Sequence, residues 1–268
     1  MAPPLILLPP SEGKAPGGEG APWSPGSMRF PELDASRRAV MGALARTMRT
    51  NAAACGKLLG VKGTALAAAR ATNRSLATAP TMPAIERYTG VLYDELDHAS
   101  LPARSRKRAA DQIVIFSALW GLVTPTDPIP DYKLKMGAAL APMGRTTTWW
   151  RPQLTAALAP LVAGRTVWDL LPNEHAAAWS PDPSSFAARV SVKFVDDTGT
   201  GAARKTVTVS HWNKLLKGAL VRHVLATQLD DPAGLAEFDH PLGYRYRPEL
   251  TTVGDDGHIE VSLVARRP

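Results

Sequence analysis

Short apolar segments that alternate with helical segments constrain the fold of this chain more than any other feature. Four consecutive aliphatic residues at Leu5–Leu8 predict a short buried strand, and the β-branched and aromatic residues of Ile113–Leu122 predict a buried strand and a turn. Further strands are expected at residues 167–171, 190–195 and 260–265, and residues 205–209 are expected to pair with 190–195 as a hairpin. We expect these strands to form one mixed sheet.

Helical segments separate the strands. The apolar residues of Glu32–Met48 recur at spacings of three, four and seven, which predicts an amphipathic helix. Two shorter helices are expected at Asn51–Leu59 and Thr64–Ala71, and another at Asn213–Gln228. Strands interspersed with helices indicate an α/β or α+β fold. We therefore expect a single compact domain over residues 1–268, with a helical insertion at about residues 32–100.

The charge balance points to an anionic partner. Lys and Arg number 31 against 24 Asp and Glu, which gives a formal net charge of +7. A basic protein attracts polyanions such as nucleic acids, although many basic proteins bind no specific polyanion. The charge alone leaves nucleic acid or phosphate binding as an open expectation.

The chain carries no sign of a membrane span or of a secretory leader. The longest apolar run near its start, Leu5–Leu8, has four residues, whereas a spanning helix needs about 20 and a signal peptide about 7 to 15. Its one cysteine, Cys55, excludes an internal disulfide and fits a reducing compartment. We expect a cytoplasmic protein that does not bind membranes and is a monomer.

A glycine turn between two helices is the first candidate for phosphate binding. Gly60 and Gly63 bracket the turn, and its surroundings carry Lys57, Lys62 and Arg70 without an acidic residue. The unpaired N–H groups at a helix start attract phosphate, and glycines allow the backbone to approach it closely. The usual helix-hairpin-helix signature spaces its glycines two apart, whereas these are three apart. An ordinary helical hairpin with a glycine cap explains the same residues.

A second basic group lies on the helix near the C-terminus. Lys214, Lys217 and Arg222 fall on one broad face of that helix, because steps of three and eight residues nearly return to the same direction. This face is expected to meet an anion, and a solvated helix surface is the alternative. Gly218, beside Lys217, indicates close backbone packing.

Polar residues that follow two predicted strands, and others in and after a proline-rich segment, are candidates for a reactive site. Ser11, Glu12 and Lys14 leave the first strand at the edge of the sheet where α/β proteins tend to bind ligands. Asp127 and Asp131 flank Pro128–Pro130, the end of a proline-rich segment, 124–130, that we expect to be irregular. The residues that follow are Tyr132 and Lys133, and the corresponding polar residues after the strand at 167–171 are Asn173 and Glu174. Asp131 is a candidate general base, and a structural turn explains it equally well.

Metal and nucleophile motifs are missing from the sequence. The six histidines form no paired ligand motif, and no Gly-x-Ser-x-Gly elbow is present. We therefore expect neither a metal nor a cofactor.

The chain resembles the YaaA family of peroxide stress proteins over nearly its whole length. The likeness rests on ordered blocks, which are far more specific together than any one of them. The blocks are Leu8–Lys14, Arg87–Tyr93, Phe116–Asp127 continued by Pro130–Gly137, Trp168–Glu174 and Val209–Gly218.

This resemblance implies a compact α/β fold with a basic cleft and a helix-hairpin-helix element that binds duplex DNA during peroxide stress. It also implies that Lys14, Asp131, Tyr132, Glu174, Lys214 and Lys217 line the cleft. Double-stranded DNA or another phosphate-bearing ligand is the expected partner. The expected phosphate-binding residues are Lys57, Gly60, Lys62, Gly63, Arg70, Lys133, His211, Lys214, Lys217 and Arg222.

An enzyme is the rival interpretation. A groove for DNA needs cations, and carboxylates such as Asp131 and Glu174 repel phosphate unless they are paired or take part in proton transfer. Under this hypothesis the chain acts on a nucleobase, nucleotide or other small anionic substrate, and Asp131, Glu174, Lys14 and Tyr132 are its catalytic residues. The sequence leaves this alternative open.

Overall fold

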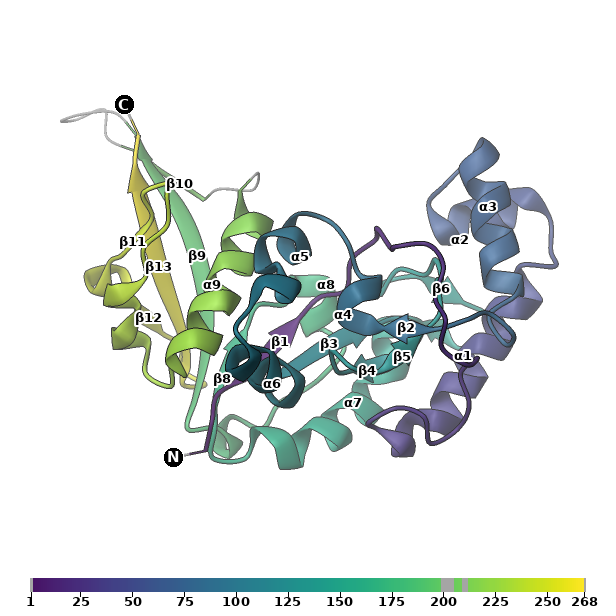
Figure 1. Ribbon diagram of the computed structural model, residues 1–268, viewed down its shortest axis with the longest axis horizontal. Helices are drawn as coiled ribbons and strands as arrows, with labels where there is room; N and C mark the ends of the chain where they lie inside the picture. The colour runs from purple at the N-terminus through teal and green to yellow at the C-terminus, as the bar shows by residue number, and fades with distance from the viewer. Residues whose placement is uncertain (1, 199–204, 209–211, 268) are drawn as a thin grey trace.

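A mixed sheet runs through the middle of the protein (Figure 1), whose structure, a computed structural model, describes residues 2–198, 205–208 and 212–267. Seven strands follow the order β11-β13-β9-β8-β1-β3-β4, with β10 added to β9 and β12 added to β13. The neighbours from β13 through β9, β8 and β1 to β3 are parallel, and the outer pairings are antiparallel. The strands are β1 (Leu5–Leu8), β3 (Ile113–Ser117), β4 (Gly121–Val123), β8 (Thr166–Asp169), β9 (Ala188–Thr198), β10 (Lys205–Thr208), β11 (Arg245–Tyr246), β12 (Thr252–Val253) and β13 (His258–Arg266).

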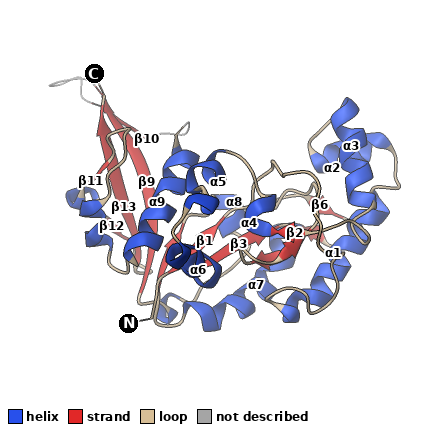
Figure 2. Ribbon diagram, in the orientation of Figure 1, coloured by secondary structure: helices blue, strands red, loops and turns tan. Residues whose placement is uncertain are grey.

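Helices pack around the sheet and extend beyond it at one end. Figure 2 shows α2 and α3 standing apart from the sheet, at the opposite end of the molecule from β13. Two short strand pairs lie outside the main sheet, β2 (Met82–Pro83) with β5 (Pro128–Ile129) and β6 (Ala139–Leu140) with β7 (Gly144–Arg145). The helices are α1 (Asp34–Thr47), α2 (Ala52–Leu59), α3 (Gly63–Arg74), α4 (Ala84–Arg87), α5 (Val91–Leu96), α6 (Ala103–Gln112), α7 (Thr146–Val162), α8 (Asn173–Ala176) and α9 (Asn213–Thr227).

The mixed α/β fold confirms the expected fold class, and the expected strands are present. β1 is buried at all four positions and pairs on both sides, with Ile6 opposite Ile113 and Trp168. The predicted hairpin also forms, because β10 pairs antiparallel with β9. The apolar runs therefore identified the strands correctly, since a strand buried on both faces needs apolar residues at every position.

One expectation about the loops was wrong. The proline-rich segment at residues 124–130 is not entirely irregular, because Pro128 and Ile129 pair with Pro83 and Met82. A pairing this short at a sheet edge tolerates proline, which only lacks the N–H donor. The sequence interpretation also missed several helices, of which α6 and α7 are the longest.

In the part of the chain that the structure describes, no helix combines the length and hydrophobicity needed to cross a membrane. The core instead contains large aromatic side chains, of which Trp120, Trp150 and Trp168 are fully buried.

The parallel strands place the candidate residues. β1 and β8 are parallel neighbours, so their carboxyl ends lie at one edge of the sheet. The loop that carries Lys14 follows β1, and the segment that carries Glu174 follows β8. Two regions far apart in sequence are thus brought to the same edge.

Candidate functional site

A small pocket of about 80 Å³ lies at this edge of the sheet. It brings together three of the predicted catalytic residues, Lys14, Tyr132 and Glu174, with Lys133 beside them. Their chemical roles remain predictions. The full lining is Pro10, Ser11, Glu12, Lys14, Tyr132, Lys133, Leu134, Lys135, Met136, Glu174 and His175.

Lys14 is the pocket's distinctive group because its amine lies among aromatic rings. The Nζ atom is 4.2 Å from the centroid of the Tyr132 ring and 5.6 Å from that of Tyr88, and it donates a hydrogen bond of 3.0 Å to the Ser11 carbonyl. Burial lowers the pKa of Lys14 to about 8, although the nearby Asp131 carboxylate raises it. With this pKa, roughly a tenth of the amine is neutral at pH 7.

The ring of Tyr132 lies against the Lys14 amine. Its hydroxyl hydrogen-bonds to Ser117 Oγ and to the Tyr88 hydroxyl, at 2.8 Å each. Burial raises the pKa of Tyr132 to about 12, so that the phenol stays protonated at physiological pH. The buried hydroxyls fix the ring on which the Lys14 ammonium rests.

Two further lysines share one carboxylate at the rim. Glu12 Oε2 lies 3.0 Å from Lys133 Nζ, and Glu12 Oε1 lies 3.2 Å from Lys135 Nζ. The hydrogen bond from Lys133 lowers the pKa of Glu12, which is itself largely exposed. Because two cations face one anion, the rim keeps a surplus positive charge that a phosphate can neutralise.

Glu174 and His175 also line the pocket. A Cβ atom added to Gly137 would lie 1.9 Å from Glu174 Oε1, so this carboxylate packs directly over the glycine. Burial lowers the pKa of His175 to about 4, which keeps the imidazole neutral at physiological pH. Its Nδ1 atom is buried and has no hydrogen-bond partner among the described residues.

The loop after β1 is held in place by Arg87 and Tyr93. The buried Arg87 guanidinium donates to the carbonyls of Ala15, Gly17 and Ile129. The Tyr93 hydroxyl donates to the Pro9 carbonyl at 2.8 Å. These residues belong to the block Arg87–Tyr93, to which the sequence analysis assigned no role, and they act here as supports for Lys14.

The glycine turn between α2 and α3 reaches the rim of the pocket. Gly60 ends α2 in a left-handed conformation with φ of 69°, and no side chain caps the start of α3 at Lys62. A Cβ atom at Gly60 would lie 3.4 Å from Lys135 Nζ. The predicted turn and the predicted pocket are therefore neighbours, linked by Lys135, a residue that the sequence analysis did not single out.

The predicted basic residues of α2 and α3 have different environments. Lys57, Lys62 and Gly63 are exposed. Arg70 is instead committed to the protein itself, because its guanidinium donates to the carbonyls of Met48 and Thr50. Arg70 thus anchors α3 to the chain after α1.

The basic residues of α9 do not meet at one point. Lys217 Nζ donates to the Leu170 carbonyl at 2.8 Å, and burial lowers its pKa. Arg222 instead donates to the carbonyl of Leu96, the last residue of α5, at 2.7 Å. Lys214 is exposed and does not line the pocket, and the predicted His211 lies outside the described residues.

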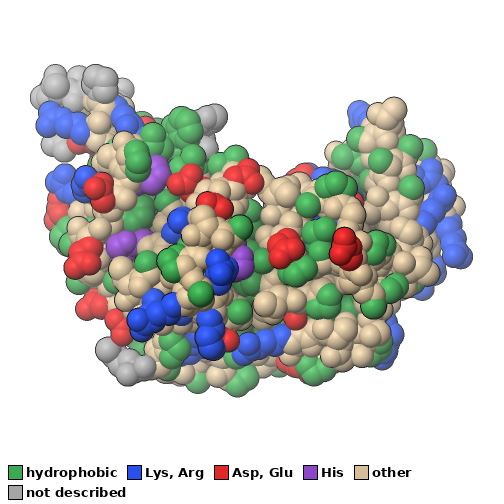
Figure 3. All heavy atoms as spheres, in the orientation of Figure 1, with side chains coloured by type: hydrophobic (Ala, Val, Ile, Leu, Met, Phe, Trp, Pro, Cys, Tyr) green, Lys and Arg blue, Asp and Glu red, His purple; other side chains and the backbone are tan. Residues whose placement is uncertain are grey.

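The space-filling view shows how the charges are distributed. On the face in Figure 3, the outline is hollowed between the arm formed by α2 and α3 and the strands at the opposite end. Lys and Arg side chains form separate groups on this face, and Asp and Glu side chains lie between them. The positive charge on this face is thus divided rather than continuous.

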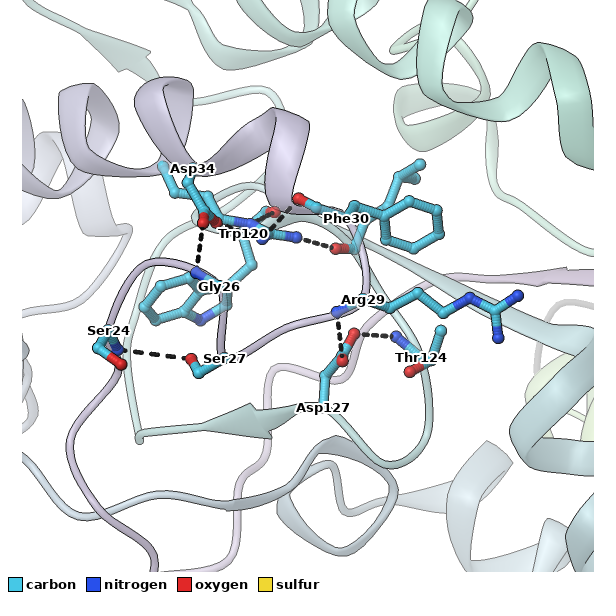
Figure 4. Close-up of polar contacts among 11 residues, drawn as sticks. Ser24, Gly26, Ser27, Arg29, Phe30, Asp34, Trp120, Thr124 and Asp127 are labelled. Atoms are coloured by element: carbon cyan, nitrogen blue, oxygen red, sulfur yellow. Dashed lines mark hydrogen bonds and ion pairs between the residues drawn. The ribbon is translucent and has the colours of Figure 1, made fainter.

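Asp127, the other aspartate of the proline-rich segment, has a structural environment. Its carboxylate accepts hydrogen bonds from the backbone N–H of Arg29 at 2.9 Å and from that of Thr124 at 2.6 Å (Figure 4). The side chain is buried and does not line the pocket. Asp127 therefore ties the loop before α1 to the β4–β5 connection.

Comparisons with known proteins agree with the resemblance found in the sequence. The family model described as "Peroxide stress protein YaaA" matches residues 5–250. A UPF0246 protein of Streptomyces coelicolor is 40% identical over 252 residues, which cover 93% of this chain and 94% of the relative. UPF0246 proteins of Corynebacterium glutamicum and Corynebacterium efficiens are each 37% identical, over 81% and 83% of this chain and 83% and 85% of their own lengths.

Proposed function

The chain belongs to the YaaA family of peroxide stress proteins, and from this premise we propose that it binds the phosphate backbone of duplex DNA during peroxide stress. The observation that carries the proposal is how near the Gly60 turn lies to Lys135, whose Nζ atom would be 3.4 Å from a Cβ atom at Gly60. The start of α3, which follows this turn and has no side-chain cap, is thereby brought near one lysine of the pocket rim.

Three kinds of phosphate-binding group support this interface. The N–H groups in the first turn of α3 have no side-chain cap, and a helix start carries a partial positive charge. Lys57 and Lys62 extend into solvent around the turn. Lys133 and Lys135 can bind a phosphate if it replaces the Glu12 carboxylate as their partner. None of these contacts reads a base, so the binding is independent of sequence.

Binding should depend strongly on salt. If about six phosphates are neutralised, the logarithm of the affinity falls with the logarithm of salt concentration at a slope near −5. Fluorescence anisotropy with a labelled duplex measures this slope. The double variant Lys57→Ala and Lys62→Ala should bind more weakly, with a slope less steep by up to about 2.

Lys107→Ala is the matched control. Lys107 lies on α6, is 80% exposed and is paired with Asp111, outside the proposed interface. Its replacement removes one lysine charge, half of what the double variant removes, and should leave the affinity unchanged. A wild-type affinity independent of salt, or equal affinities for the double variant and the control, would contradict the proposal.

An enzyme acting on a nucleobase, nucleotide or other small anionic substrate is the second candidate. The convergence of Lys14, Tyr132 and Glu174 on one pocket favours it, because DNA backbone binding alone needs no carboxylate there. Asp131 acts electrostatically on Lys14 and would tune it. If no candidate substrate is turned over and Asp131→Asn leaves DNA affinity intact, while Lys62→Ala weakens DNA binding, the enzyme hypothesis loses its main support.

A further inference from the structure

The environment of Lys14 differs from that of Lys217, another half-buried lysine. Lys217 donates to the Leu170 carbonyl and does not line the pocket. Lys14 lines it, and its amine is covered on one side by Tyr132 and Tyr88. A reactant in the pocket can therefore approach this amine from the side that the two rings leave uncovered.

The size of the pocket restricts what reaches this amine. Its volume of about 80 Å³ is well below the roughly 300–1,000 Å³ of sites that enclose a drug-sized ligand. Such a pocket admits a small reactive group that is carried on a larger molecule. The rim lysines and the glycine turn lie where the phosphates of that molecule would bind.

We propose that Lys14 is a nucleophile that forms an imine with an aldehyde, and that this aldehyde is the open-chain C1′ of an abasic deoxyribose in bound DNA. The inference rests on the proposed function, because the bound duplex delivers the aldehyde to the pocket. A desolvated lysine is the side chain that forms Schiff bases with carbonyl groups in proteins. The loss of bases from oxidised DNA generates this aldehyde.

The reaction balances without a cofactor. The Lys14 nitrogen adds to C1′, and the amine proton moves to the former aldehyde oxygen to give a carbinolamine. A proton taken up from solvent lets that oxygen leave as water, which gives the protonated imine. The Glu174 carboxylate, on the pocket wall, is placed to take the C2′ proton, after which the 3′ phosphate leaves and the strand is cut. Water then hydrolyses the imine and returns Lys14.

Reductive trapping tests the proposal. The full-length protein is incubated with a labelled duplex that contains one abasic site, and sodium borohydride is added to reduce any imine to a stable amine. A covalent adduct on a denaturing gel is expected, and peptide mapping should place it on Lys14. Lys14→Arg keeps the positive charge but is not nucleophilic at neutral pH, so it should give at least tenfold less adduct than the wild type. Lys107→Arg, at an exposed position of α6, should match the wild type.

The outcomes separate this inference from the proposed function. If intact duplex binds with the expected salt dependence but no adduct forms, or the adduct maps to another lysine, the inference is overturned and the DNA-binding proposal stands. If the duplex does not bind and abasic DNA is not trapped, both are overturned, and trapping of deoxyribose 5-phosphate on Lys14 would then assign the site to a free aldehyde. If the Lys14→Arg variant does not fold, the position of the adduct in the wild-type protein, found by peptide mapping, tests the proposal by itself.

Discussion

Lys14 Nζ lies 4.2 Å from the centroid of the Tyr132 ring, and the hydroxyl of that ring is hydrogen-bonded to Ser117 and Tyr88. The face of an aromatic ring carries a partial negative charge that attracts a cation. This attraction offsets part of the cost of burying the ammonium, and the remaining cost lowers the pKa of Lys14. The same arrangement therefore holds the lysine in place and makes it easier to deprotonate.

The first prediction concerns stability as a function of pH. The pKa of Lys14 is lowered from 10.5 to about 8, so between these values the unfolded chain binds more protons than the folded protein. Stability relative to a Lys14→Met variant should therefore rise as the pH increases from about 8 to 10.5, by up to roughly 3 kcal/mol. Urea unfolding of both proteins across this range measures the difference. A constant difference would show that Lys14 titrates normally.

Tyr132→Phe separates the ring from its hydroxyl. The ring that supports Lys14 is kept, whereas Ser117 and Tyr88 lose a buried hydrogen-bond partner. We expect the free energy of unfolding to fall by about 1–3 kcal/mol. The pH dependence assigned to Lys14 should persist, and its disappearance would mean that the hydroxyl rather than the ring face controls the amine.

Gly137→Ala should displace Glu174 without unfolding the protein. The new Cβ would lie 1.9 Å from Glu174 Oε1, and this exposed carboxylate can move away. We expect unfolding free energy to change by less than about 1 kcal/mol, and cutting of abasic DNA to slow severalfold while imine trapping persists. Gly42→Ala, in the middle of α1, is the control, and it should cut at the wild-type rate. Equal cutting by both variants would remove Glu174 from the proposed proton transfer.

The elements found by sequence reasoning were those that carry a local pattern. Leu5–Leu8 is apolar at every position, and α1 repeats its apolar residues at helical spacing. In contrast, α7 contains Pro152 and Pro160, which would ordinarily end a helix. It forms because Trp150, Leu154 and Leu158 pack into the core. α6 is so rich in charge that its buried side consists mainly of small and polar residues.

The site was predictable to a similar extent. Lys14 and Glu174 were identified because each follows a strand, and parallel strands bring their carboxyl ends together. The aromatic surroundings of Lys14 could not be predicted, because Tyr88 and Tyr132 meet only through tertiary packing. Helical geometry predicted that Lys217 and Arg222 share a face of α9. In the structure Lys217 donates to Leu170, just after β8, and Arg222 donates to Leu96 of α5.

Gly218→Ala should test how closely α9 must approach α5. A Cβ atom at Gly218 would lie 2.4 Å from the Leu92 carbonyl oxygen and 2.9 Å from Glu95 Cβ, and backbone cannot move as readily as an exposed side chain. Overpacking of this kind typically costs about 1–3 kcal/mol. Chemical denaturation should show this loss, whereas Gly42→Ala should be neutral or stabilising, as expected for alanine in a helix. A fully stable Gly218→Ala protein would show that α5 and α9 can separate.

Asp127 and Asp131 should respond differently to the same replacement. Asp127 accepts two backbone hydrogen bonds in the interior, so Asp127→Asn leaves one N–H facing an amide nitrogen and should cost about 1–3 kcal/mol of stability. Asp131 accepts no side-chain or backbone hydrogen bond from the described residues, and its charge raises the pKa of Lys14. Asp131→Asn should therefore change stability little and lower that pKa further, which amine-selective labelling of Lys14 against pH can follow. The reverse result, with Asp127→Asn shifting the labelling of Lys14 and Asp131→Asn destabilising the fold, would exchange the roles assigned to the two carboxylates.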